Sequence, residues 1–342
     1  MRSITITTEN KQSHVLIGER LQNLRSYLPD GKVIIITDDN ILRYYAADMP
    51  PFPIISIGTG EKHKTLETLV HIFEKLIEHE ADRTTYIVGI GGGIVCDVAG
   101  FAASVYMRGL RFGFVSSTLL SQVDASVGGK NGVNFRRFKN MLGVFNQPEF
   151  VICDPFMLKT LEKNEFIAGF AEIVKAGAIK SAPLFEYLEA NVDKALSAHE
   201  EVLEKIVYES VRIKADVVEN DEKEKGLRRI LNFGHTFAHA FENMSDLLHG
   251  EAVSMGMVLA SRLSCKMGYL SKTDSDRIEN LLSRLQLPVK PVVELRKAFE
   301  PMKQDKKREG NAVFMVFLKQ IGEAVIEKIT YKNLEEVLND LC

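Results

Sequence analysis

The first part of the chain alternates short apolar runs with stretches of helical spacing. Apolar runs occupy residues 32–37 (KVIIIT), 52–57 (FPIISI) and 85–90 (TYIVGI), and polar or glycine residues follow each of them. Between the second and third runs, residues 65–79 space their large apolar side chains along one helical face. Short apolar strands joined by helices predict a parallel sheet that is covered on both faces.

The pattern changes near residue 155. Helical spacing extends over residues 165–179, 201–220, 231–242 and 251–266, and only residues 312–318 (AVFMVFL) favour a strand, as part of a late hairpin. We therefore predict two domains. Residues 1–155 form an α/β domain of the dinucleotide-binding, Rossmann-like type, and residues 156–342 form a mostly helical domain.

Three consecutive glycines follow the third apolar run in IVGIGGGIVCDVAGF and precede a predicted helix. Glycine lets the backbone approach a phosphate closely, and the free N–H groups at a helix start favour an anion. The spacing is not that of GxGxxG, because Ile94 stands where the third glycine would be. Gly91, Gly92 and Gly93 are candidates for binding a nucleotide phosphate, and a tight turn without a ligand is the alternative.

Further polar candidates follow the predicted strands, where nucleotide contacts are common in parallel sheets. They are Asp38, Asn40, Glu61, Lys64 and Asp97. For each of them alone, a solvated turn residue is the competing interpretation.

Three of the eight histidines fall within fifteen residues of one another. His235 and His239 are four residues apart on a predicted helix, so they share a face, and His249 begins the next helix. Two imidazoles and a carboxylate make a divalent metal site with open positions. Glu172, which has Lys175 one helical turn later, is the candidate carboxylate. A surface Glu–Lys pair with helix-lining histidines is the alternative.

Basic and amide side chains recur in segments rich in glycine and small residues. Such groups suit phosphate and carboxylate through charge-assisted hydrogen bonds, although ordinary surface charge explains most lysines. The candidates, with one acidic neighbour, are Arg108, Asp124, Lys130, Lys139, Asn140, Lys214, Arg228, Asn232, Lys306 and Lys307. Of these, Asp124, Lys130, Lys139 and Asn140 are expected in loops.

Composition and charge argue against several classes of protein. The net charge of −3 gives no general attraction to nucleic acid or to a membrane, and no apolar run approaches the roughly 20 residues that span a bilayer. The four cysteines form no CxxC pair, which argues against a zinc site of cysteines and against a disulfide framework. The N-terminal MRSITITTENK is too polar for a secretory signal, so we expect a cytoplasmic protein.

Taken together, the motifs resemble those of the 3-dehydroquinate synthase family over residues 32–325. They are GEKHKT (60–65), GGGIVCDVAGFAASVYMRG (91–109), STLLSQVDASVGGKNGVN (117–134), KNMLGVFNQP (139–148), LKTL (158–161), AGFAEIVKAG (168–177), IKADVVENDEKEKGLRRILNFGHTFAHAFE (213–242), LHGEAVSMGM (248–257) and DKK (305–307).

The resemblance implies a role for each candidate residue. The implied ligands of a divalent metal, zinc or cobalt, are Glu172, His235 and His249. The implied NAD contacts are Asp38, Asn40, Glu61, Lys64, Gly91–Gly93, Asp97, Ser117, Thr118, Asp124, Lys130, Lys139 and Thr160. The implied substrate pocket holds Lys130, Asn140, Lys175, Lys214, Arg228, Asn232, His239 and Lys306. Arg108 is implied to reach the substrate phosphate from a neighbouring subunit, which implies a homodimer.

The implied reaction is a step of the shikimate pathway of aromatic amino acid biosynthesis. NAD oxidises a secondary alcohol of the phosphorylated sugar acid 3-deoxy-D-arabino-heptulosonate 7-phosphate, phosphate is eliminated, and the same NADH returns the hydride. Ring opening and an intramolecular aldol closure then give 3-dehydroquinate. The cofactor carries the hydride chemistry, and the protein orients groups and neutralises charge.

Some positions depart from the family pattern, and three other functions compete. Ser116-Ser117 replace Pro-Thr, Asn131 replaces Thr in GGKTG, and Phe138 replaces the glycine that commonly precedes Lys139. Another sugar-phosphate cyclase, of the deoxyinosose or valiolone type, is the nearest alternative. A metal-dependent polyol dehydrogenase of the same fold and a binding protein without activity are the others.

Overall fold

The chain folds into two compact units, each with its own core. A computed structural model describes residues 1–9, 11–136, 138–291 and 312–339. The first unit comprises Met1–Glu162 and Lys214–Lys223, and the second comprises Lys163–Ile213 and Glu224–Cys342. The long helix α7 (Glu200–Asn220) therefore contributes its first two-thirds to one unit and its end to the other.

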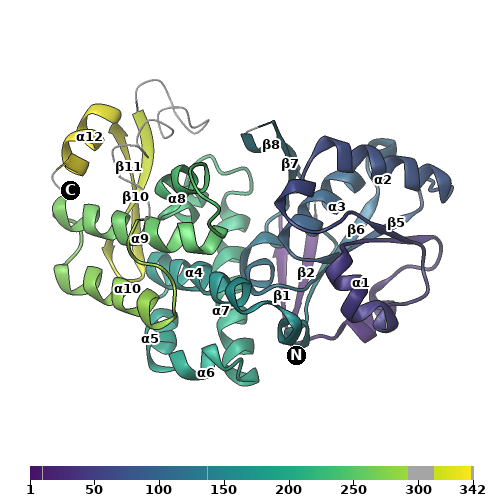
Figure 1. The fold of residues 1–342 in the computed structure, drawn as a ribbon, viewed down its shortest axis with the longest axis horizontal. Coiled ribbons are helices and arrows are strands. Elements are labelled where there is room, and N and C mark those ends of the chain that lie inside the picture. Colours follow the sequence, from purple (N-terminus) through teal and green to yellow (C-terminus); the bar gives the residue numbers. More distant parts are fainter. Residues whose placement is uncertain (10, 137, 292–311, 340–342) are drawn as a thin grey trace. The chain divides into compact units, whose positions relative to one another are not determined.

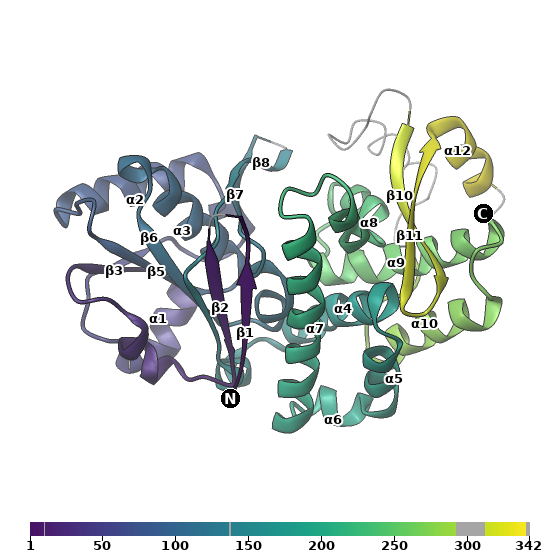
Figure 2. The same cartoon turned by 180° about the vertical axis from the view of Figure 1, so that it is seen from behind.

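The first unit is built on a seven-stranded sheet of order β1-β2-β9-β6-β5-β3-β4 (Figure 1). Only β1 and β2 pair antiparallel, as neighbours that Figure 2 shows side by side, and all other pairs are parallel. The strands are β1 (Arg2–Thr7), β2 (Gln12–Ile17), β3 (Val33–Thr37), β4 (Ile54–Ser56), β5 (Tyr86–Gly91), β6 (Arg111–Ser116) and β9 (Phe150–Cys153). The expected Rossmann-like parallel sheet is confirmed.

Helices cover both faces of this sheet. The crossover helix α1 (Asp39–Tyr45) lies on one face, and α2 (Leu66–Glu78) and α3 (Gly93–Val105) lie on the other (Figure 1). Right-handed crossovers explain this division. The chain moves outward from β3 to the edge strand β4 and then back past β3 to β5 and β6. The helix before β4 and the helices after it therefore lie on opposite faces. The short helices are η1 (Leu21–Tyr27), η2 (Ala46–Asp48), η3 (Glu61–His63), η4 (Tyr106–Arg108), the π-helical η5 (Ser121–Ala125) and η6 (Pro155–Thr160).

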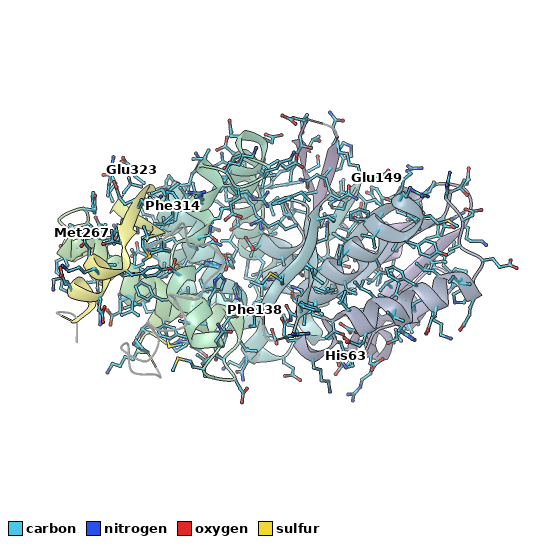
Figure 3. The ribbon with its side chains drawn as sticks, turned by 90° about the horizontal axis from the view of Figure 1, so that it is seen from above. His63, Phe138, Glu149, Met267, Phe314 and Glu323 are labelled. Carbon is cyan, nitrogen blue, oxygen red and sulfur yellow. The ribbon has the colours of Figure 1, made fainter. Side chains whose placement is uncertain are left out.

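A separate two-stranded hairpin of the first unit consists of β7 (Lys130–Phe135) and β8 (Phe138–Phe145). Lys130, Lys139 and Asn140 were expected in loops, and this expectation is wrong, because all three lie on these strands. The short apolar runs of the hairpin gave little strand signal. Phe138 and Phe145 are 41% and 45% exposed, and Phe138 is labelled in Figure 3.

The second unit is mostly helical, as expected. Its helices are α4 (Lys163–Lys180), α5 (Ala182–Ala190), α6 (Val192–Leu196), η7 (Leu227–Asn232), α8 (His235–Glu242), α9 (His249–Lys266), α10 (Lys272–Arg284) and α12 (Tyr331–Asn339). The central helix α9 packs against α4, α8 and α10. The expected late hairpin is confirmed as β10 (Ala312–Gln320) paired antiparallel with β11 (Glu323–Thr330).

One helix was predicted with the wrong extent. Residues 231–242 were expected to be a single helix, but η7 ends at Asn232 and α8 begins at His235. Gly234 between them has φ +79, and a Cβ there would lie 2.7 Å from the backbone N of Met257. The left-handed glycine ends one helix and lets the next start directly against α9.

None of the described helices combines the length and the apolar character that crossing a bilayer requires. Cys96 and Cys153 are buried free thiols of the first unit, and Cys265 is a partly buried free thiol of the second. Burial raises the pKa of Cys96 and of Cys153 well above that of an ordinary thiol.

Candidate active site

Three ligand side chains meet inside the second unit. One ligand atom each of Glu172, His235 and His249 lies within 4.8 Å of the others. Both imidazole Nε2 atoms are 3.4 Å from Oε1 of Glu172. Glu172 and His235 are 2% and 8% exposed, and His249 is partly exposed, so the cluster is open on the His249 side.

Glycines bring the three helices that carry these ligands into close contact. A Cβ on Gly250 would lie 1.9 Å from the carbonyl oxygen of Ala168, one helical turn before Glu172 on α4. A Cβ on Gly256 would lie 2.2 Å from the carbonyl oxygen of Gly234, the residue before His235. Helix backbones can approach this closely only where Cβ atoms are absent. The glycines of α9 therefore let the start of α9 pack against α4 and let the start of α8 pack against α9.

Each imidazole of the cluster is oriented by an acceptor at its other nitrogen. Nδ1 of His235 is 3.2 Å from the carbonyl oxygen of Phe233, and Nδ1 of His249 is 3.1 Å from Oε1 of Glu242. With a proton on each Nδ1, both Nε2 atoms present lone pairs toward Glu172. This is the arrangement by which protein groups around a metal site fix the tautomer of its histidines.

The electrostatics of the cluster favour an ionised Glu172. Burial by itself raises the pKa of this carboxyl, but the ion pair with Lys175 and the neighbouring imidazoles outweigh burial and hold the pKa well below its ordinary value. Burial and Lys175 lower the pKa of His235 to about 4. Burial lowers the pKa of His249, but hydrogen bonds to Glu172 and Glu242 raise it to about 9.

The donor set fits a divalent cation. Both carboxylate oxygens of Glu172 are fully buried, and their neighbours within the described residues are the ammonium of Lys175 and the two imidazoles. A buried carboxylate is costly unless opposite charge compensates it. One carboxylate and two imidazoles leave coordination positions open.

The other candidates of the second unit lie near this cluster in the sequence. Arg228 is 2% exposed, and the His239 ring centroid is 5.9 Å from that of His235. The amide of Asn232 donates a 2.5 Å hydrogen bond to Glu224. Lys306 and Lys307 fall outside the described residues. Neither Glu224 nor Glu242 was identified from the sequence. Glu242 lies seven residues after His235 on the same helical face, and this spacing could have indicated that it belongs to the site.

In the first unit, several candidates form one polar cluster. The ammonium of Lys64, which is 6% exposed, donates to Asp97 at 2.5 Å and to Asn140 at 2.6 Å. Glu61 accepts a 2.8 Å hydrogen bond from Asn134. Burial raises the pKa of Asp97 in spite of Lys64.

The triple glycine packs closely against its neighbours at the start of α3. Gly91 ends β5 and accepts from the backbone N–H of Ser117, and Gly92 is the N-cap of α3. A Cβ on Gly92 would lie 3.0 Å from the side chain of Thr118, and a Cβ on Gly93 would lie 2.9 Å from that of Ala125. The glycines therefore let the start of the helix approach these two residues more closely than other residues would allow.

The remaining candidates are placed separately in the first unit. Asp38 caps α1 through Ile41, and Thr160 bonds to the hydroxyl of Tyr45 at 2.7 Å. Asp124 on η5 pairs with Lys214, at 2.8 Å between Oδ1 and Nζ. Asn40 and Arg108 are exposed.

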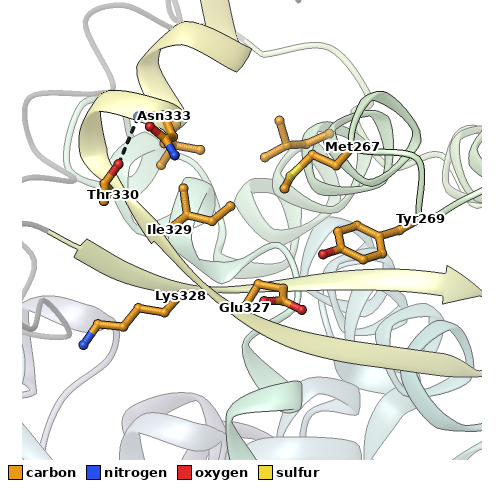
Figure 4. Close-up of a pocket in the computed structure, with 9 residues that line it drawn as sticks. Met267, Tyr269, Glu327, Lys328, Ile329, Thr330 and Asn333 are labelled. Carbon is orange, nitrogen blue, oxygen red and sulfur yellow. Dashed lines mark hydrogen bonds between the residues drawn. The ribbon is translucent and has the colours of Figure 1, made fainter.

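A cavity of about 250 Å³ in the second unit is lined by Leu263, Met267, Tyr269, Glu327, Lys328, Ile329, Thr330, Asn333 and Leu334 (Figure 4). It contains none of the predicted site residues.

The fold and the ligand cluster first define a structural class. A 2-deoxy-scyllo-inosose synthase solved with carbaglucose-6-phosphate, NAD+ and Co2+ matches with a TM-score of 0.89 at 26% identity, over 99% of this chain and 100% of that one. ValA, a 2-epi-5-epi-valiolone synthase of Streptomyces hygroscopicus with NAD+ and Zn2+ bound, matches with a TM-score of 0.89 at 27% identity over 98% of both chains. The chain shares the fold of these synthases.

Family models identify the chain more closely. Residues 54–168 match the model of the 3-dehydroquinate synthase N-terminal domain, and residues 169–308 match that of the C-terminal domain. A 3-dehydroquinate synthase of Campylobacter concisus is 44% identical over 292 residues, which are 84% of this chain and 83% of the relative. The chain belongs to the 3-dehydroquinate synthase family, and the resemblance inferred from its motifs is confirmed.

Proposed function

We propose that the protein converts 3-deoxy-D-arabino-heptulosonate 7-phosphate to 3-dehydroquinate and phosphate, using NAD and one divalent metal ion, zinc or cobalt. The observation that carries the proposal is the cluster of Glu172, His235 and His249 in a chain of this family. Both synthases of the same fold were solved with NAD+ and with Co2+ or Zn2+.

In this proposal, Glu172, His235 and His249 hold the metal. Support comes from the low pKa of Glu172, which keeps an anionic ligand at neutral pH, and from the acceptors at both Nδ1 atoms. The bound ion supplies Lewis-acid polarisation of a substrate oxygen.

We propose that residues 1–155 bind NAD and that residues 156–342 carry the metal and most of the substrate contacts. The NAD contacts are those that the resemblance implies, from Asp38 to Thr160. The position of Gly91–Gly93 between the end of β5 and the start of α3 supports phosphate binding by the N–H groups of the first turn of α3. When bound, NAD would supply the hydride chemistry, and the residues of this chain would orient the substrate and neutralise its charge.

The basic residues are proposed to hold the anionic substrate. Arg228 is buried and keeps its charge at any working pH, so it suits a carboxylate or phosphate by a bidentate contact. Lys130, Asn140, Lys175, Lys214, Asn232, His239 and Lys306 complete the proposed set. Preorganised donors of this kind stabilise the charge that develops as phosphate leaves.

A homodimer with Arg108 shared between subunits is part of the proposal. Met107 and Arg108 have φ of 47° and 74°, and Met107 is 45% exposed. A left-handed backbone at two successive non-glycine residues costs free energy that a function can explain. Mixing inactive Arg108→Ala with inactive His235→Ala subunits should restore partial activity. Mixed dimers without activity would contradict the shared site.

The test of the activity is phosphate release from 3-deoxy-D-arabino-heptulosonate 7-phosphate in the presence of NAD and a divalent metal, with and without chelator. We expect release that the chelator stops and that added metal restores. No release would refute the proposal. Release from a hexose or heptulose phosphate instead would favour the deoxyinosose or valiolone type, and net NADH from a simple polyol would favour a dehydrogenase.

We also propose a cytoplasmic location, because Cys96, Cys153 and Cys265 are free thiols, as is usual in a reducing compartment.

A further inference from the structure

A β-bulge interrupts the β7–β8 hairpin beside Asn134. Val133 pairs with Leu142 and Phe135 pairs with Phe138, and the register shifts between Val133 and Phe135. One residue of β7, Asn134, therefore lies opposite three residues of β8, Lys139, Asn140 and Met141, so the additional residues of the bulge belong to β8. Bulges are frequent beside functional sites.

The groups freed by the bulge make three hydrogen bonds to neighbouring segments. The backbone N–H of Asn134 donates to the carbonyl oxygen of Lys64 at 2.8 Å. Its side-chain amide donates to Oε1 of Glu61 at 2.8 Å, and its side-chain oxygen accepts from the backbone N–H of Asn140 at 2.8 Å. One side chain thus connects the η3 segment with β8.

These bonds close a ring through Lys64. The Lys64 ammonium donates to the side-chain oxygen of Asn140 at 2.6 Å, and Asn140 returns to Asn134 through its N–H. Asn140 has φ 49°, a left-handed conformation that is uncommon for non-glycine residues but that asparagine adopts more readily than most. Asn134 satisfies the N–H of Asn140 in this conformation and so stabilises it.

We propose that Asn134 is a positioning residue that holds the cofactor-side groups Glu61 and Lys64 in register with the substrate-side Asn140. This inference rests on the proposed function, which gives these three residues their roles. Asn134 itself needs no contact with either ligand. Its three bonds fix the η3 segment to the β7–β8 hairpin, and positioning errors of about 1 Å can cost about 100-fold in rate.

The test uses Asn134→Asp, which is isosteric. Aspartate still accepts from the N–H of Asn140, but it cannot donate to Glu61 and places a second carboxylate 2.8 Å from that of Glu61. Repulsion should move Glu61 away. We expect the Kd for NAD, measured by isothermal titration calorimetry, to rise about tenfold, the cost of roughly one charge-assisted hydrogen bond. We also expect kcat/KM for the sugar acid to fall by at least as much.

The matched control is Asn23→Asp. The amide of Asn23 also donates to a glutamate, with 2.8 Å to Oε1 of Glu19, but it lies on η1 and takes no part in the proposed site. This variant should lose a similar amount of thermal stability and keep the wild-type Kd for NAD. The metal affinity of both variants should stay at the wild-type value, because the metal ligands belong to the other unit.

The outcomes separate the inference from the proposed function. Wild-type protein that binds no NAD would overturn both. Wild-type binding together with an Asn134→Asp variant within twofold in Kd and kcat/KM would overturn the inference alone, as would equal effects of the two variants on NAD. If Asn134→Asp does not fold, Asn134→Ala decides, because it removes both side-chain bonds without repulsion, and wild-type kinetics in that variant would also overturn the inference.

Discussion

Replacing Glu242 with leucine should weaken divalent metal binding by about 10- to 100-fold, the usual cost of removing an acceptor behind a metal-binding histidine. Oε1 of Glu242 is 3.1 Å from Nδ1 of His249, and the Glu242 side chain is 4% exposed. Without this acceptor, the His249 ring can rotate and can place its proton on Nε2. The loss corresponds to about 1.4–2.7 kcal/mol of binding free energy.

The protonation state of His249 also affects the measured metal affinity. Glu242 helps to raise the pKa of His249 to about 9, so near neutral pH a proton must leave His249 before a metal binds. The leucine variant lacks the hydrogen bond from Glu242, so the pKa of His249 should fall and protons should compete less with the metal. The deficit of the variant should therefore be smaller near neutral pH, where wild-type His249 is protonated, than near pH 9, where about half of it has lost its proton.

The assay is competition between the protein and a chromogenic chelator for Zn2+ or Co2+ at the two pH values. Glu242→Gln keeps an acceptor but loses the charge, so its deficit should lie between those of wild type and the leucine variant. Glu279→Gln removes a carboxylate that pairs with Arg262 elsewhere in the same unit, and it should bind metal normally. Wild-type affinity of Glu242→Leu at both pH values would refute the reasoning.

Three further predictions follow from other contacts. His235→Ala should abolish metal binding and turnover with little change in far-UV circular dichroism; a variant that keeps full activity would exclude His235 as a ligand. Gly250→Ala would place a Cβ 1.9 Å from the carbonyl oxygen of Ala168, so both stability, by about 1–3 kcal/mol in urea unfolding, and metal affinity should fall; unchanged values for both would contradict the close helix contact. Tyr27 donates a hydrogen bond to Glu19. Burial raises the pKa of Glu19, but this hydrogen bond and others outweigh burial and hold the pKa below its ordinary value. A lowered pKa stabilises the fold above the unfolded value, so Tyr27→Phe should be less stable than wild type at neutral pH, and the difference should shrink as the pH falls below about 4; a difference independent of pH would contradict the role of the carboxylate.

The elements with strong periodicity were predictable from the sequence, and the weakly patterned ones were not. Residues 65–79 and 251–266 became α2 and α9 because their apolar faces pack on other elements. The strands β1 and β2 gave no signal in the sequence, since β1 lies at the sheet edge and buries only Ile6. The hairpin β7–β8 was likewise missed, because it is a small sheet of its own with several exposed apolar residues.

The metal ligands could be proposed from residue type and spacing, but the groups around them could not. Glu172 is more than sixty positions from His235 in the chain, and only the chemistry of a carboxylate with two imidazoles suggested that they meet. Glu242 acts through one hydrogen bond to His249, and Asn134 acts through three hydrogen bonds to neighbouring segments. Such contacts depend on a helix end and on a bulge, which local sequence patterns do not specify.

Each unit of the chain contains at least one free cysteine whose reaction with a thiol reagent can be followed. Cys96 and Cys153 are fully enclosed and resist ionisation, so a thiol reagent should label them only when the N-terminal half opens. Cys265 reports on the other half. In a Cys342→Ser background, the order in which these thiols react during slow denaturation would reveal whether the two halves unfold together or one after the other.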